Sequence, residues 1–218
     1  MGIAAIFDWD GTLVDSSAAH KWAWETLAAD EGLALPENHF VKGFGYTNPK
    51  IIREIYVWSQ DEAEISRLGD RKEELYRARL GTMTLRPLPG VLPFLEALRA
   101  AGVPCAIGTS TPRENINVAA ATAGLDGFFA ASTCGDEVKN GKPDPEVFLT
   151  CAEKLGVPPE RCAVFEDAPH GLQAAKNAQM LAIGITTTHP AQDLPQADLV
   201  IDSFADLTVS RLLELLQR

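Results

Sequence analysis

Residues 3–12 have the sequence IAAIFDWDGT, in which a short apolar run ends at an acidic turn. The run contains the β-branched residues Ile3 and Ile6, and a short continuous apolar stretch is typical of a strand buried on both faces of a sheet. Asp8 and Asp10 follow it, and aspartate and glycine favour turns. We therefore expect a buried strand that ends in a loop carrying two carboxylates.

The chain beyond residue 81 alternates between patterns typical of buried strands and of amphipathic helices. The predicted strands there are 103–108, 128–132, 162–165, 181–185 and 199–201, and a single helix is predicted at 203–216. Such alternation implies βαβ units and a parallel sheet. Residues 16–81, in contrast, are predominantly helical in pattern, and Asp61 can cap one of the helices there. The sequence predicts an α/β protein whose doubly wound, Rossmann-like parallel sheet core is formed by residues 1–15 and 82–218, with a helical cap domain inserted at 16–81.

Composition argues against several classes of protein. The formal net charge of −11 disfavours a general affinity for nucleic acid or anionic membranes. No apolar run approaches the roughly 18 residues of a membrane span, and the first apolar stretch is too short for a signal peptide, so we expect a cytoplasmic protein. The 4 cysteines form no CxxC pair, which disfavours a zinc cluster or a redox motif.

Polar residues follow four of the predicted strands. In an open parallel sheet, ligands bind beyond the carboxyl ends of the strands, so these residues are expected to converge. In chain order they are Asp8 and Asp10, then Thr109, Ser110 and Thr111, then Lys142, and finally Glu166 and Asp167.

This set of side chains suits phosphoryl transfer. Clustered carboxylates need a cation, and hard oxygen ligands favour Mg²⁺. Asp8 can then attack phosphorus, while Asp10 protonates the leaving alcohol and later deprotonates water. Hydroxyl groups at Thr109 and Ser110, together with the Lys142 ammonium, can hold the phosphoryl oxygens. The sequence therefore predicts a Mg²⁺-dependent enzyme with an aspartate nucleophile.

The order of these motifs resembles that of the haloacid dehalogenase-like superfamily. The resemblance rests on the run from Asp8 to Leu13, on Thr109 or Ser110 after a strand, on the run from Gly141 to Pro145, and on Glu166 with Asp167. The helical insert after the first motif is similar to the small cap of β-phosphoglucomutase and sugar-phosphate phosphatases. A second, local likeness, at residues 56–61 and 71–74, is to plant-type phosphatases of a riboflavin precursor.

The resemblance implies a role for each matching residue. Asp8 would be nucleophile and metal ligand, and Asp10 would be acid/base and offer its backbone carbonyl to Mg²⁺. Thr109 would hold phosphate with help from Ser110 and Thr111, and Lys142 would bridge the phosphate and Asp8. Asp167 would bind the metal, with Glu166 beside it, directly or through water. In the cap, His20 would lie near the sugar, and Lys42 and Gly43 would belong to a loop that faces the site.

Structural explanations compete with each of these roles. Asp8 and Asp10 can be simple turn residues, and Thr109–Thr111 can be a helix cap before Pro112. Glu166 and Asp167 can be an acidic pair that favours a helix N-terminus. His20 can be a structural histidine, and Lys42 can be a surface charge.

The leading functional hypothesis is a phosphatase of a small phosphorylated metabolite, acting as a monomer. The first alternative is a sugar phosphomutase, but residues 44–48 lack the arginine that mutases carry after the Lys-Gly pair of the cap. The second alternative is a non-catalytic binding protein on the same fold. It is disfavoured because such a protein is expected to have lost an aspartate or the lysine.

Overall fold

The computed structural model describes residues 2–217, and its centre is a six-stranded sheet whose paired strands are all parallel. The strands are β1 (Ala4–Phe7), β2 (Cys105–Gly108), β3 (Ala131–Thr133), β4 (Cys162–Glu166), β5 (Leu181–Ile185) and β6 (Leu199–Ile201). Their order across the sheet is β3-β2-β1-β4-β5-β6. The predicted α/β fold with a parallel sheet is confirmed.

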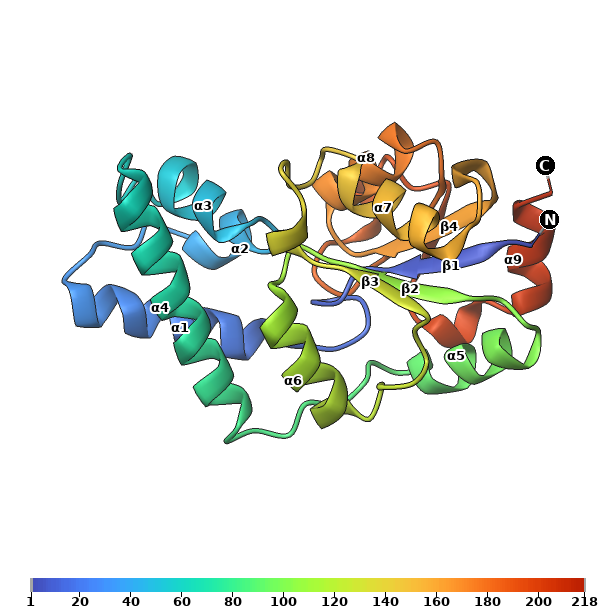
Figure 1. Cartoon of the computed structure of the whole chain (residues 1–218), viewed down its shortest axis with the longest axis horizontal. Helices are drawn as coiled ribbons and strands as arrows, with labels where there is room; N and C mark the ends of the chain where they lie inside the picture. Colours follow the sequence, from blue (N-terminus) through green and yellow to red (C-terminus); the bar gives the residue numbers. More distant parts are fainter. Residues whose placement is uncertain (1, 218) are drawn as a thin grey trace. The chain divides into compact units, whose positions relative to one another are not determined.

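Helices cover both faces of this sheet. They are α5 (Val91–Ala100), α6 (Arg113–Ala123), α7 (Glu146–Leu155), α8 (Pro169–Asn177) and α9 (Val209–Leu215). Figure 1 shows α7 and α8 on one face and α5 and α9 on the other. Both faces of β1 and β4 are therefore buried, which explains why these strands are continuous apolar runs rather than alternating ones.

The strand order reverses between β1 and β4. Chain connections leave β1 toward β2 and β3 on one side and then return to β4 on the other. Phe7 of β1 pairs in register with Ile107 of β2 and Phe165 of β4, and the rings of Phe7 and Phe165 stack with centroids 4.7 Å apart. The crevice beyond the carboxyl ends of strands at such a reversal is where open α/β sheets bind ligands.

Two predicted elements differ from those observed. The strand expected at 128–132 is found at Ala131–Thr133, and the single helix expected at 203–216 is divided. A 3-10 turn, Phe204–Asp206, follows Ser203, and a separate helix α9 starts after Thr208, whose hydroxyl accepts from the Arg211 N–H at 3.2 Å. Each of these caps closes off its own helical segment, which the apolar periodicity alone does not reveal.

The chain forms two compact units. The sheet unit comprises the residues up to Asp15 and those from Arg86 onward, and the helical unit is Ser16–Leu85. The assignment of a catalytic core at 1–15 and 82–218 and a cap at 16–81 stays a prediction about domains. Among the described residues, none of the helices has both the length and the apolarity that a membrane span requires.

The helical unit is built mainly on two long helices. Its elements are α1 (Ser17–Glu31), α2 (His39–Gly43), α3 (Asn48–Lys50), a π-helical turn (Ile51–Ile55) and α4 (Glu62–Leu80). Asp61 caps α4, as the sequence predicts, by accepting the Glu64 N–H at 2.9 Å. Ile65, Leu68 and Leu75 form a buried stripe along α4.

A buried ion pair lies on α4. Lys72 Nζ donates to Glu73 Oε1 at 2.9 Å, and both side chains are almost fully buried. Asn48 Nδ2 also donates to Glu73 Oε1, at 2.6 Å. Burial alone would raise the pKa of Glu73, but the positive charge and the donors around it outweigh burial and lower that pKa. Removing one partner would leave the other charge buried without compensation.

We expect Glu73→Ala to lower the free energy of unfolding by about 3–5 kcal/mol, because it removes the carboxylate that pairs with the buried Lys72 ammonium. The matched control is Glu74→Ala, which removes an exposed partner of Arg71 and is expected to cost less than about 1 kcal/mol. Urea denaturation measures both values. Since the pKa of Glu73 is lowered, the stabilisation is present above the ordinary glutamate pKa and is lost as the pH falls below about 4. Equal costs for the two variants at pH 7 would contradict this account.

Candidate active site

The predicted strand-end residues of the sheet unit converge in space. Asp8 follows β1, Thr109 follows β2, Glu166 is the last residue of β4, and Asp167 comes next. Lys142 reaches the same place from the loop before α7, and all five side chains are buried. The structure thus brings together the residues that the sequence singled out at four strand ends.

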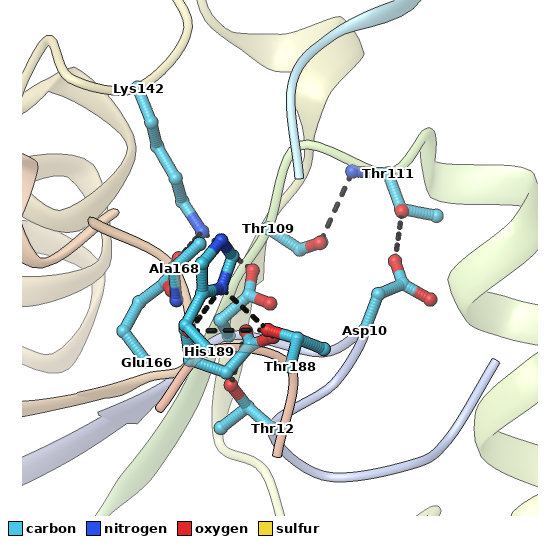
Figure 2. Close-up of polar contacts among 11 residues, drawn as sticks. Asp10, Thr12, Thr109, Thr111, Lys142, Glu166, Ala168, Thr188 and His189 are labelled. Carbon is cyan, nitrogen blue, oxygen red and sulfur yellow. Dashed lines mark hydrogen bonds and ion pairs between the residues drawn. The ribbon is translucent and has the colours of Figure 1, made fainter. Parts of the chain in front are cut away.

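Lys142 is the positive centre of this cluster. Its Nζ donates to Asp8 Oδ1 at 2.6 Å and to Glu166 Oε1 at 2.8 Å, as Figure 2 shows for Glu166. The other oxygen of Glu166 accepts the Ala168 N–H at 2.7 Å. Burial alone would lower the pKa of Lys142, but Asp8 and Glu166 outweigh it and raise that pKa. Lys142 therefore stays charged, with Glu166 fixed behind it.

Asp8 is a buried carboxyl group with other negative charges nearby. The pKa of Asp8 is raised to about 7. Burial is the largest cause, the charges of Glu166 and Asp10 also raise this pKa, and the charge of Lys142 lowers it. Its backbone N–H donates to Phe165 O at 3.0 Å, which fixes the start of the loop against β4. A buried carboxyl with so high a pKa needs further positive charge to remain ionised at neutral pH.

Asp10 and the hydroxyl residues after β2 form the second part of the cluster. The Thr111 hydroxyl donates to Asp10 Oδ2, and Thr109 Oγ1 accepts the Thr111 N–H at 3.1 Å (Figure 2). Ser110 lies between them and is half-buried. Gly11 has a φ of +81°, in the left-handed region that favours glycine, and lets the loop turn directly after Asp10.

Three carboxylates are placed to hold a cation. Asp8, Glu166 and Asp167 each offer an oxygen within 4.8 Å of the others. Burial raises the pKa of Asp167 well above its ordinary value, helped by the charges of Glu166 and Asp8. Four buried carboxyl groups, counting Asp10, thus face one buried ammonium. Both the donor chemistry and this excess of negative charge fit a hard divalent cation.

The residues predicted to belong to the cap lie on α1 and α2 of the helical unit: His20 on α1, and Lys42 and Gly43 on α2. The Nδ1 atom of His20 is 2.8 Å from Lys72 Nζ, and its ring stacks on Tyr76 with centroids 4.0 Å apart. Gly43 is buried at the end of α2, whereas Lys42 beside it is exposed. The contacts of His20 fit the structural explanation that the sequence left open.

Three residues of this cluster were not predicted from the sequence. Thr188 and His189 contact Asp167 from the loop after β5, and Gly171 of α8 packs against the Glu166 side chain. The strand-end rule applies to β5 as well, so the polar run after residue 185 was a usable signal for Thr188 and His189. Gly171 left no such signal, because its role depends on how closely α8 approaches β4.

A sequence model described as haloacid dehalogenase-like hydrolase matches residues 4–179 of the chain, a range that includes the whole buried cluster. The chain belongs to the haloacid dehalogenase-like hydrolase family. The predicted family resemblance is therefore confirmed, and the relatives it matches include several phosphatases.

Individual members of the family resemble the whole chain. It is 32% identical over 209 residues to the chloroplastic 5-amino-6-(5-phospho-D-ribitylamino)uracil phosphatase of Arabidopsis thaliana, covering 95% of this chain and 56% of that protein. It is 34% identical to hexitol phosphatase A of Escherichia coli, over 94% of this chain and 93% of that protein. The crystal structure of β-phosphoglucomutase from Clostridium difficile superposes with a TM-score of 0.87 at 28% identity, covering 100% of this chain and 98% of that one.

We expect Gly171→Ala to impair this hydrolase without unfolding it. A Cβ at position 171 would overlap the Glu166 carboxyl group, so Glu166 would have to move away from Lys142. A displacement of about 1 Å at such a site can lower kcat by about 10²-fold. The matched control is Gly69→Ala in α4, where a Cβ meets only ordinary van der Waals contacts. Alanine there is expected to raise the free energy of unfolding by up to about 1 kcal/mol. Steady-state kinetics and thermal melts measure both variants, and full activity of Gly171→Ala would contradict the packing argument.

Proposed function

We propose that this protein is a Mg²⁺-dependent phosphatase that hydrolyses a small phosphorylated metabolite, a sugar phosphate or a similar compound, through a phosphoryl group carried on Asp8. The observation that carries the proposal is the contact of Lys142 with Asp8 and Glu166 at the strand ends, next to Asp167. One ammonium and several carboxylates around a buried nucleophile suit the transfer of a dianionic group.

Mg²⁺ would be held by Asp8 and Asp167, with Glu166 bound directly or through water and the Asp10 carbonyl as a further oxygen. The bound ion would neutralise charge between the nucleophile and the phosphoryl oxygens. Both oxygens of Glu166 already accept hydrogen bonds, from Lys142 and from the Ala168 N–H. This favours indirect participation of Glu166, as the anchor of Lys142.

Asp8 would act as the nucleophile. Its carboxylate oxygen attacks phosphorus, a P–O bond to Asp8 forms, and the bond from phosphorus to the leaving alcohol oxygen breaks. Lys142 bonds to Oδ1 of Asp8, which leaves Oδ2 for the attack, and the bound cation would add the positive charge that keeps Asp8 ionised. In the second step water attacks phosphorus, the bond to Asp8 breaks, and inorganic phosphate is released.

Asp10 would move the protons of both steps. In the first it donates a proton to the leaving alcohol oxygen, and in the second it takes one from the attacking water. The hydroxyl of Thr111 donates to Asp10 Oδ2, which fixes the orientation of the Asp10 carboxyl group. The hydroxyls of Thr109 and Ser110, with Lys142, would hold the remaining phosphoryl oxygens.

The substrate class comes from the relatives. The Arabidopsis relative is named for a phosphorylated ribityl compound and the Escherichia coli relative for hexitols. We propose a phosphorylated sugar or sugar alcohol as substrate. The assignment of His20, Lys42 and Gly43 to substrate binding rests on the family resemblance.

A sugar phosphomutase is the second candidate, since the chain superposes closely on a β-phosphoglucomutase. Arg53, the first arginine in the sequence after Lys42 and Gly43, lies in the π-helical turn and pairs with Glu62. An assay with β-glucose 1-phosphate separates the candidates. We expect inorganic phosphate to be released, whereas formation of glucose 6-phosphate without phosphate release would establish the mutase.

We expect Asp8→Asn to abolish phosphate release in a screen of phosphorylated sugars and sugar alcohols with Mg²⁺, because an amide cannot replace the nucleophile. Asp10→Asn should lower kcat by about 10²–10⁴-fold through loss of proton transfer. The matched control, Asp126→Asn, changes an exposed aspartate outside the cluster and should leave activity unchanged. Circular dichroism checks that each variant is folded. Activity in Asp8→Asn equal to that of the unsubstituted protein would refute the proposed mechanism.

A further inference from the structure

Thr188 contacts the candidate metal ligand Asp167 from a different strand. It lies in the loop after β5, the strand that pairs with β4 on the side away from β1. The Thr188 hydroxyl donates to Asp167 Oδ2 and is also 3.2 Å from the Asp167 backbone oxygen. Figure 2 shows Thr188 and His189 together beside this part of the cluster.

His189 supports Thr188 from behind. Its Nδ1 atom is 2.9 Å from Thr188 Oγ1 and 3.0 Å from the Asp167 backbone oxygen. The Thr188 hydroxyl has one proton, and the Asp167 carboxylate is the best acceptor within reach. The hydroxyl therefore donates its hydrogen bond to that side chain rather than to His189. The Nδ1 atom of His189 then carries a hydrogen and donates to the backbone oxygen and to Thr188 Oγ1.

The other side of the Asp167 carboxylate is held as well. Thr12 Oγ1, fully buried, donates to Asp167 Oδ1 at 3.2 Å. A Cβ on Gly11 would overlap Asp167 Oδ2, so the loop after β1 lies directly against this carboxylate. Each oxygen therefore accepts one hydroxyl, and the plane of the carboxylate is fixed from both sides.

We propose that Thr188, supported by His189, is a positioning residue that fixes Asp167 for binding the divalent cation. The inference rests on the proposed metal-dependent function and deepens it by adding the loop after β5 to the site. Partners behind a metal ligand orient it, and their loss commonly weakens metal binding by about 10–100-fold. A Thr188 that only stabilised the fold would affect unfolding without affecting metal affinity.

Calorimetric titration of the full chain with Mg²⁺ alone, without substrate, tests this role. Thr188→Val keeps the shape and removes the hydroxyl, and we expect its Mg²⁺ dissociation constant to rise by about 10–100-fold. Thr188→Ser restores a hydroxyl and should bind Mg²⁺ much as the unsubstituted protein does. The control Thr187→Val changes an exposed neighbour and should bind normally. In kinetics, Thr188→Val should require more Mg²⁺ for half-maximal rate while keeping most of its kcat at saturating Mg²⁺.

The outcomes separate the two proposals. Mg²⁺ binding by the unsubstituted protein with equal affinity in Thr188→Val would overturn the positioning role and leave the proposed function intact. A lower melting temperature with unchanged Mg²⁺ affinity would overturn it in the same way. If the unsubstituted protein does not bind Mg²⁺, both proposals fall. Should Thr188→Val fold poorly, Thr188→Ala compared with Thr188→Ser provides the same contrast.

Discussion

The site depends on an imbalance of buried charge. Asp8, Glu166 and Asp167 are buried close to one another at one edge of the sheet, where Lys142 contacts Asp8 and Glu166, and Asp10 is buried on the loop after β1. Burying several carboxylates against one ammonium is unfavourable unless hydrogen bonds and a further cation compensate for it. The raised pKa values of Asp8 and Asp167 express that cost. The same imbalance makes the edge attractive to a hard divalent cation and, once the cation is bound, to a phosphoryl group.

The architecture creates this imbalance. Parallel strands place all their carboxyl ends at one edge, and the reversal of strand order between β1 and β4 opens a crevice there. Only strands buried on both faces can hold the carboxylates so deep, and β1 and β4 are such strands. The continuous apolar run before Asp8 is therefore a requirement of the chemistry as well as of the fold, because it fixes the nucleophile at the centre of the sheet.

Much of the fold and of the site could be predicted from the sequence, and there are physical reasons why the rest could not. Apolar runs followed by polar residues predicted the parallel sheet and the meeting of Asp8, Thr109, Lys142 and Asp167, because strand direction alone fixes where strand ends lie. Contacts that depend on close packing were not predictable in this way. Gly171 matters because α8 approaches Glu166, and the last helix divides because caps at Ser203 and Thr208 outweigh its apolar pattern. Thr188 follows the strand-end rule, but its contact with Asp167 also depends on how the loop after β5 lies against the end of β4.

The most direct test of the central claim is to locate the transferred phosphoryl group. Acid quenching during turnover of a sugar phosphate with Mg²⁺, followed by peptide mapping by mass spectrometry, identifies the residue that carries it. We expect a phosphorylated peptide that contains Asp8. This peptide should accumulate more in Asp10→Asn, because that substitution slows attack by water on the phosphorylated intermediate. A phosphoryl group on another residue, or none under conditions in which Asp10→Asn still turns over, would contradict the account.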